Sequence, residues 1–120
     1  MKRDPNRFDD LFHHFGPISI RRMFGGEGIY AGDLMIGLVA DDQIYLKTGE
    51  GNRADFEAEG CRAFSFPRGD KIMVLPYHAV PERLLDDPEA FAAWARRAEA
   101  AALAAKSAGG KKRRPRKGHK

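Results

Sequence analysis

The chain has 120 residues, and its composition, 42% hydrophobic with 8 Phe, 3 Tyr and 1 Trp, suits one modest hydrophobic core and predicts a single folded domain. No apolar run approaches the roughly 18 residues of a membrane span, and residues 1–5 lack the apolar stretch of a secretory signal peptide, so we expect a cytoplasmic protein with no membrane partner. Cys61 is the only cysteine, which excludes an internal disulfide and a zinc site built from several thiolates.

Positive charge is concentrated towards the C-terminal end. The formal net charge is +4, but residues 1–105 hold 13 Lys and Arg against all 17 Asp and Glu, whereas residues 106–120 hold eight Lys and Arg and no acid. A segment with no hydrophobic anchor buries too little apolar surface to offset the conformational entropy that it would lose on folding. We therefore expect a mildly acidic folded domain over residues 1–106 and a disordered basic tail over residues 107–120.

The first predicted element is an amphipathic helix. Asp4 and Pro5 suit a helix start, because the aspartate can accept hydrogen bonds from free N–H groups and the proline lacks only a donor that would be unpaired there. Gly16-Pro17 ends the element. Between them, apolar residues recur at the helical spacing i, i+3, i+4 and i+7, namely Phe8, Leu11, Phe12 and Phe15.

Residues 18–48 have the pattern of strands and turns that is typical of an antiparallel meander. Short apolar runs alternate with three groups of turn-forming residues, Gly25–Gly28, Gly32-Asp33 and Asp41-Asp42. The run Leu34–Ala40 is apolar at successive positions, as expected for a strand buried on both faces. It is therefore predicted to be the central strand.

A short helix and a second hairpin follow. Asn52 can cap a helix that Phe56 anchors and Gly60 ends. Two further strands are predicted over residues 63–66 and 71–77, because a turn-forming cluster separates them. This second hairpin can extend the first sheet.

The last predicted element is a long helix. Asp87-Pro88 starts it with the same cap and proline as the first helix, and Ser107–Gly110 breaks it. Its inward face consists of Phe91, Trp94, Ala95, Ala98 and Ala102. The element order α-β-β-β-β-α-β-β-α predicts a two-layer α+β fold in which helices cover a mainly antiparallel sheet.

Several segments resemble the TfoX/Sxy N-terminal domain family. They are Arg21–Tyr30, Leu34–Ala40, Ile44–Lys47, Asn52–Phe56, Pro76–Glu82 and Asp86–Ala95. The most specific part is the string Arg-Arg-Met-Phe-Gly-Gly, together with the spacing of the Lys-Thr and Asn-Arg pairs downstream of it. The resemblance runs from residue 12 to residue 105.

The resemblance implies a curved antiparallel sheet in a secretion-chaperone-like arrangement. It also implies a regulatory role, which in the founding members concerns the genes for DNA uptake (competence). Longer members of the family carry a second, helical domain where this chain has its basic tail. The family has no established catalytic residues, so none is carried over to this chain.

A candidate partner-binding surface lies at the first predicted hairpin. It comprises Arg21, Arg22, Met23, Phe24, Gly25 and Gly26. Neighbouring strand residues point to opposite faces, so at least one of the two arginines lies near the helix-covered side and needs a partner. Either the arginines pair with acids of the domain, such as Asp33, Asp41 or Glu27, or they and the glycine turn bind a protein.

Other candidate sites have ordinary structural interpretations. Gly26–Ala31 matches the letters G-x-G-x-x-A of a dinucleotide motif, but the segment joins a strand to a strand, so a tight hairpin is expected instead. His13 and His14 are neighbours on a helix and point about 100° apart, a poor geometry for a metal. Cys61 is expected to be a small buried hydrophobe. We predict no catalytic residue, no metal and no cofactor.

The basic tail is the second candidate binding segment. Its charged residues are Lys111, Lys112, Arg113, Arg114, Arg116 and Lys117. A flexible polycation binds phosphates weakly, in a salt-sensitive and largely sequence-independent way, so nonspecific contact with DNA or RNA is expected. The tail has no aromatic residues for base stacking. A purely solubilising role and attraction to anionic lipids are the alternatives.

The leading functional hypothesis is a non-catalytic regulatory or protein-interaction module, whose partner the sequence does not identify and whose tail adds nucleic-acid affinity. The alternative is a nucleic-acid-binding accessory protein that acts mainly through the tail. An open sheet leaves edge strands that must be blunted or paired, so a homodimer is a further alternative. An enzyme has no positive support in the sequence.

Overall fold

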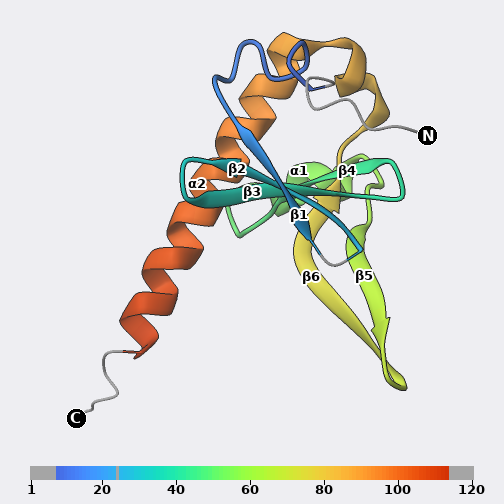
Figure 1. The fold of residues 1–120 in the computed structure, drawn as a ribbon, viewed down its shortest axis with the longest axis vertical. Helices are drawn as coiled ribbons and strands as arrows, with labels where there is room; N and C mark the ends of the chain where they lie inside the picture. Colours follow the sequence, from blue (N-terminus) through green and yellow to red (C-terminus); the bar gives the residue numbers. More distant parts are fainter. Residues whose placement is uncertain (1–7, 24, 114–120) are drawn as a thin grey trace.

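Six antiparallel strands form one sheet in the spatial order β1-β2-β3-β4-β6-β5, with β1 and β5 at its edges (Figure 1). The computed structural model describes residues 8–23 and 25–113, of which residues 108–113 are described by their backbone alone. The strands are Ser19–Met23 (β1), Gly26–Ala31 (β2), Leu34–Ala40 (β3), Gln43–Lys47 (β4), Ala63–Arg68 (β5) and Lys71–Ala79 (β6). The helices are Arg53–Ala58 (α1), the 3-10 helix Glu82–Asp86 (η1) and Pro88–Arg113 (α2). The predicted α+β fold is confirmed.

β3 is the central strand of the meander, as predicted. It pairs with β2 on one side and β4 on the other, and four successive residues, 36–39, are buried. Ala40 pairs with Gln43 across a two-residue turn in which Asp41 and Asp42 have φ angles of 52° and 64°. Positive φ at both turn residues is the requirement of a type I′ turn, whose twist matches that of the flanking strands.

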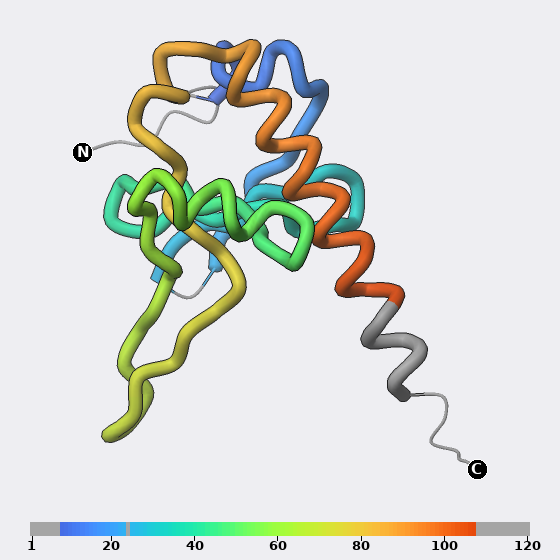
Figure 2. Tube along the Cα trace, turned by 180° about the vertical axis from the view of Figure 1, so that it is seen from behind, coloured from blue at the N-terminus to red at the C-terminus, as the bar shows by residue number. Residues whose placement is uncertain are grey.

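α2 covers the sheet with a face of small residues. Ala95 and Ala98 are fully buried beside Phe91, as the sequence predicts for the inward face, and this face packs against β3 and β4. Figure 2 shows the helix crossing the sheet and running on beyond it. Asp87 caps the helix, because its Oδ1 accepts a hydrogen bond of 3.2 Å from the N–H of Ala90.

Residues 8–15 form successive turns rather than the predicted α-helix. The N–H groups of Phe12 and Gly16 bond to the carbonyl groups four residues earlier, but those of His13 and Phe15 bond three residues earlier. A segment this short is marginal as a helix in water, so its shape follows its packing. Phe8 and Phe12 are nevertheless buried as predicted, Leu11 and Phe15 are partly buried, and the ring of Phe12 meets that of Phe91 edge to face at 4.9 Å.

The glycine segment after β1 also differs from the prediction. Met23 pairs with Gly26, and Gly26–Gly28 belong to β2 rather than to the turn. Gly25 has a φ of +80°, a conformation that favours glycine. Gly26 has a different role, because a Cβ atom there would lie 2.3 Å from the carbonyl oxygen of Val39.

The short helix α1 is present, but Asn52 does not cap it through its side chain. Its Oδ1 accepts a hydrogen bond from the N–H of Gly49 (2.8 Å) and its Nδ2 donates one to the carbonyl oxygen of Lys47 (3.0 Å). The side chain is buried and stabilises the loop between β4 and α1. Phe56 anchors the helix as predicted and is fully buried.

α2 continues to Arg113, so the helix does not break at Ser107–Gly110 as predicted. A glycine costs a helix interior about 1 kcal/mol relative to alanine. An established helix adds one hydrogen bond for each further residue, and the alanine-rich run ahead of the glycines favours that extension. Lys111, Lys112 and Arg113 lie on this helical backbone, whereas residues 114–120 lie outside the described residues.

The close approach at Gly26 predicts a steric effect of Gly26→Ala. The added methyl group meets backbone, which cannot move without disturbing the β2–β3 pairing, and we expect the free energy of unfolding to fall by about 2 kcal/mol. Gly51→Ala is the control, because no heavy atom lies within 4 Å of the position that its methyl group would take. Urea denaturation of both variants measures the difference, and equal effects would contradict the steric account.

Candidate protein-interaction site

The sheet has two apolar faces. Val39 and Ile44 pair across β3 and β4 and belong to the core under α2. Leu38 and Tyr45 pair one residue along, so they point to the opposite face, which we call the open face. Leu38 is only 3% exposed although it lies outside the core under α2. Other side chains of the sheet therefore cover it.

An apolar groove of about 760 Å³ lies on the open face. It runs between the β1–β2 hairpin and the hairpin formed by β5 and β6, which we call the arm and which extends away from the rest of the sheet in Figure 1. Its apolar side chains come from Met23 of β1, Leu38 and Ala40 of β3, and Phe64, Phe66, Pro67 and Leu75 of the arm; Val39, whose side chain belongs to the core, also borders it. Its other lining residues are Gly25, Gly26, Glu27, Asp41, Ser65 and Arg68. Since strands from both ends of the sheet line one groove, the sheet is curled towards its open face.

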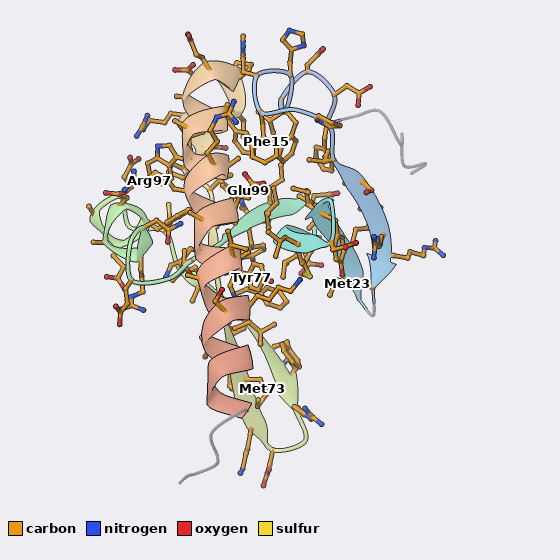
Figure 3. All side chains as sticks on the ribbon, turned by 90° about the vertical axis from the view of Figure 1, so that its left-hand side faces the viewer. Phe15, Met23, Met73, Tyr77, Arg97 and Glu99 are labelled. Carbon is orange, nitrogen blue, oxygen red and sulfur yellow. The ribbon has the colours of Figure 1, made fainter. Side chains whose placement is uncertain are left out.

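Three residues of the predicted surface line this groove, namely Met23, Gly25 and Gly26. Met23 is 38% exposed, high for a large apolar side chain, and Figure 3 shows its place at the end of β1. Phe24 lies outside the described residues.

Arg21 and Arg22 lie on different faces of β1. The guanidinium of Arg21 lies over the ring of Tyr30, 4.2 Å from its centroid, on the open face. Arg22, one residue along, points to the face that carries α2. The ion pairs that the structure gives for the described residues join Arg53, Arg83 and Arg97 to acids, and neither Arg21 nor Arg22 is among them.

Aromatic side chains line the open face from the centre to the arm. Tyr45 meets Phe64 edge to face at 5.1 Å, and Phe64 meets Phe66 at 5.9 Å. Burial raises the pKa of Tyr77, with a smaller contribution from Tyr30. This face therefore offers rings and aliphatic side chains to a ligand, with few polar groups.

The contribution of the arm was not predicted from the sequence. Phe64 and Phe66 alternate with Ser65, a pattern that indicates a strand with one apolar face. The pattern alone could have identified the strand face, but the groove opposite Met23 arises from the curl of the sheet, which no local pattern specifies.

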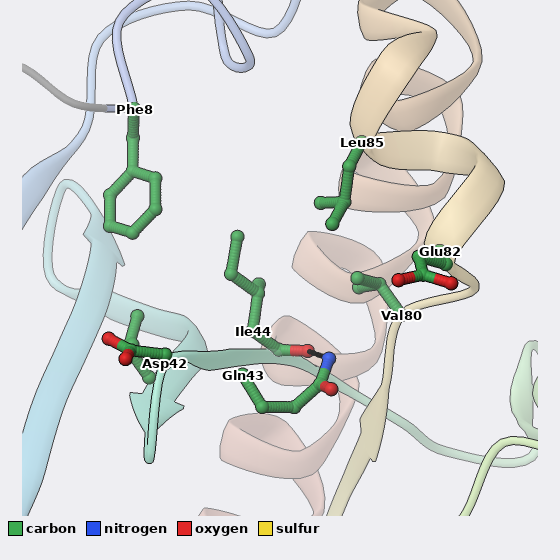
Figure 4. Close-up of a pocket in the computed structure, with 8 residues that line it drawn as sticks. Phe8, Asp42, Gln43, Ile44, Val80, Glu82 and Leu85 are labelled. Atoms are coloured by element: carbon green, nitrogen blue, oxygen red, sulfur yellow. Dashed lines mark hydrogen bonds between the residues drawn. The ribbon is translucent and has the colours of Figure 1, made fainter.

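A second hollow, of about 440 Å³, lies where the N-terminal turns, β4 and η1 meet (Figure 4). Phe8, Ile44, Val80 and Leu85 form its apolar walls, and three of them belong to the core. The amide of Gln43 donates a hydrogen bond of 3.0 Å to the carbonyl oxygen of Ile44. We assign this hollow to packing at the edge of the core.

A buried polar cluster joins β6 to the end of β4. Nδ1 of His78 lies 3.0 Å from the hydroxyl oxygen of Thr48, and the imidazole packs against the ring of Phe56 with 5.7 Å between centroids. Thr48 and His78 are 4% and 6% exposed. Burial is the main cause that lowers the pKa of His78; Glu57 raises it and Arg53 lowers it to smaller extents.

The remaining candidates show no arrangement for chemistry. His13 and His14 are exposed, and among the described residues no three His, Cys, Asp or Glu side chains are grouped to hold a metal ion. Burial raises the pKa of the Cys61 thiol, the opposite of an activated nucleophile. No helix in the described part of the chain is long and apolar enough to cross a bilayer.

The fold and the groove define a small α+β domain with helices on one sheet face and an apolar groove on the other. Residues 10–102 match the TfoX N-terminal domain family, and the chain belongs to this family. It is also 33% identical over 82 residues to the DNA transformation protein TfoX1 of Aliivibrio fischeri. The match covers 68% of this chain but only 39% of that relative's length.

The buried imidazole of His78 predicts acid sensitivity. The lowered pKa in the folded state means that the unfolded chain takes up the proton more readily. The contribution of His78 to stability is complete above its unfolded-state pKa of about 6.5 and is lost as the pH falls through its folded-state pKa.

The measurement is urea denaturation at pH 7.5 and pH values down to about 5, where few carboxylates change charge. His78→Asn, whose side-chain oxygen can accept from Thr48 without titrating, should be less sensitive to pH over this range. His13→Asn is the control and should behave like the unmodified protein. Equal pH dependence of all three proteins would contradict the role of His78.

Proposed function

We propose that this chain is a non-catalytic regulatory module of the TfoX type, which binds a protein partner through the groove of its open face and acts in the control of DNA-uptake genes. The observation that carries the proposal is the groove itself, apolar and lined partly by an exposed methionine, on a sheet face away from α2. The regulatory part of the proposal rests on the family and on the name of the TfoX1 relative.

The chemistry of the groove suits a protein partner. Aromatic residues, Met and Arg are enriched in the centres of protein interfaces, where apolar side chains are desolvated. Phe64, Phe66 and Met23 supply such anchors, and Arg68 supplies a cation at the border. The partner would insert apolar side chains between the β1–β2 hairpin and the arm.

The basic tail adds a second proposed contact. Lys111, Lys112, Arg113, Arg114, Arg116 and Lys117 would attract nucleic-acid phosphates without reading sequence. Through α2 they are covalently joined to the domain that holds the partner, so the tail would raise the concentration of the partner near DNA or RNA. In the alternative, the tail is the whole function and the domain is its carrier.

The groove proposal predicts that Phe66→Glu weakens function. A carboxylate in the groove would have to be desolvated when the partner binds, so expression of DNA-uptake genes should fall about tenfold or more in a host whose own gene is replaced by this variant. Val74→Glu is the matched control, because Val74 lies on the same arm, is 63% exposed and is not part of the groove lining.

Thermal unfolding of both variants separates binding from folding. If Phe66→Glu unfolds early, Met23→Glu at the exposed side of the groove replaces it. Equal loss of expression with Val74→Glu and with the groove variants would contradict the groove as the binding site.

The tail proposal predicts a salt-dependent loss of DNA retention. Replacing the six basic residues 111–114, 116 and 117 by Gln should abolish retention on DNA at low salt and flatten the dependence of log K on log salt by about 0.9 for each phosphate that is no longer neutralised. Expression of DNA-uptake genes should fall less than with Phe66→Glu. If the Gln variant loses all function while the groove variants keep theirs, the nucleic-acid accessory protein is the correct description.

A further inference from the structure

β1 has a free edge. It is the first strand in the order of the sheet, and in the described part of the chain β2 is the strand that pairs with it. Figure 3 shows β1 along the side of the molecule, next to Met23 and away from α2. An edge of this kind is a template on which another extended segment can pair.

The register identifies the peptide groups at this edge. The two-residue turn makes Met23 and Gly26 the closing pair of the hairpin, and hydrogen-bonded pairs alternate from there. Met23, Arg21 and Ser19 therefore direct their peptide groups towards β2. Ile20 and Arg22 direct theirs to the free side.

The opposite edge of the sheet is protected. Arg68 pairs with Lys71 across a two-residue turn, so the same alternation directs the peptide groups of Ser65 and Pro67 to the free side of β5. Proline has no N–H to offer, and proline is a common device against pairing at edges. β1 has no proline, so one edge of the sheet is blocked and the other is open.

The side chains of β1 define the charge of a matching strand. Arg21 and Arg22 are exposed and point to different faces, so a strand beside β1 would place two successive residues next to the two guanidinium groups. Acidic residues at both positions would form cross-strand pairs of opposite charge. On either side of the arginines, Ile20 packs against the core and Met23 lines the groove, and both favour apolar neighbours.

We propose that β1 binds an extended segment of a protein partner with the pattern apolar-acidic-acidic-apolar, which adds a seventh strand to the sheet. The inference rests on the proposal that the domain binds a protein partner, and it names the segment of that partner that is held. The main chain of the segment supplies hydrogen bonds to Ile20 and Arg22. The apolar residue beside Met23 continues into the groove of the open face.

A second copy of this chain suits the edge less well. Two β1 strands side by side would bring four arginines onto one short ribbon. Like charges on neighbouring strands destabilise the pairing, so the arginines work against self-association while they attract an acidic segment.

The test uses the peptide Thr-Val-Glu-Glu-Val-Thr-amide, which carries fluorescein on its N-terminal amine, titrated with the full chain and followed by fluorescence anisotropy. Binding should slow amide hydrogen exchange at Ile20 and Arg22 more than elsewhere in β1. A peptide with Lys-Lys in place of Glu-Glu should not bind.

Two pairs of variants separate the backbone and charge contributions. Arg22→Ala removes one charge and should weaken binding about threefold, whereas Arg22→Pro also removes the free N–H and should weaken it about tenfold further. The proline leaves the β1–β2 ladder intact because that N–H faces away from β2. The double variant Arg21→Glu with Arg22→Glu should bind the Lys-Lys peptide and reject the Glu-Glu peptide.

The inference is overturned if the Glu-Glu peptide does not bind, or if Arg22→Pro binds it as well as Arg22→Ala does. It is also overturned if the double variant still prefers the Glu-Glu peptide to the Lys-Lys peptide. Sedimentation showing a dimer that Arg22→Pro dissociates would instead assign the edge to a second copy. These results are independent of the groove experiment. If the peptide fails to bind while Phe66→Glu still lowers the expression of DNA-uptake genes, this inference is wrong and the proposed function stands.

Discussion

The packing of the alanine face of α2 on β3 and β4 is the contact on which the rest of the structure depends. Ala95 and Ala98 are fully buried, and their small side chains let the helix backbone lie close to the sheet, with Phe91 filling the space at one end. This contact buries one face of the sheet. It leaves the other face, which is also apolar at Leu38 and in the arm, to form the groove as the sheet curls.

The curl turns a sheet face into a groove. Met23 on β1 and Phe66 on β5 line the same hollow, although these two strands are the opposite edges of the sheet. Small residues assist this geometry, because at Gly26 the backbone of β3 lies where a side chain would be. The glycine string that resembles a dinucleotide motif therefore serves close strand packing, and the same string contributes to the proposed binding surface.

The two edges of the sheet and the C-terminal basic run have different places in the proposed contacts. β5 is blocked by Pro67 and carries the apolar wall of the groove, whereas β1 is open and carries Arg21 and Arg22. The basic residues 111–113 belong to α2, and none of the described residues that line the groove does. The two proposed contacts, with a protein and with a nucleic acid, would thus use separate parts of the chain.

Local patterns in the sequence determined much of this protein: the central strand Leu34–Ala40, the inward face of α2 and the cap at Asp87 follow from periodicity and from single residues with fixed conformational preferences. Patterns were insufficient where packing decides between near-equal local conformations, as in residues 8–15, which bury their aromatic rings as turns, and at Asn52, whose side chain bonds to the loop rather than to the helix. The groove could not be predicted from the sequence at all. It depends on the curl that brings β1 towards the arm, and such contacts between distant strands arise only when the whole sheet is formed.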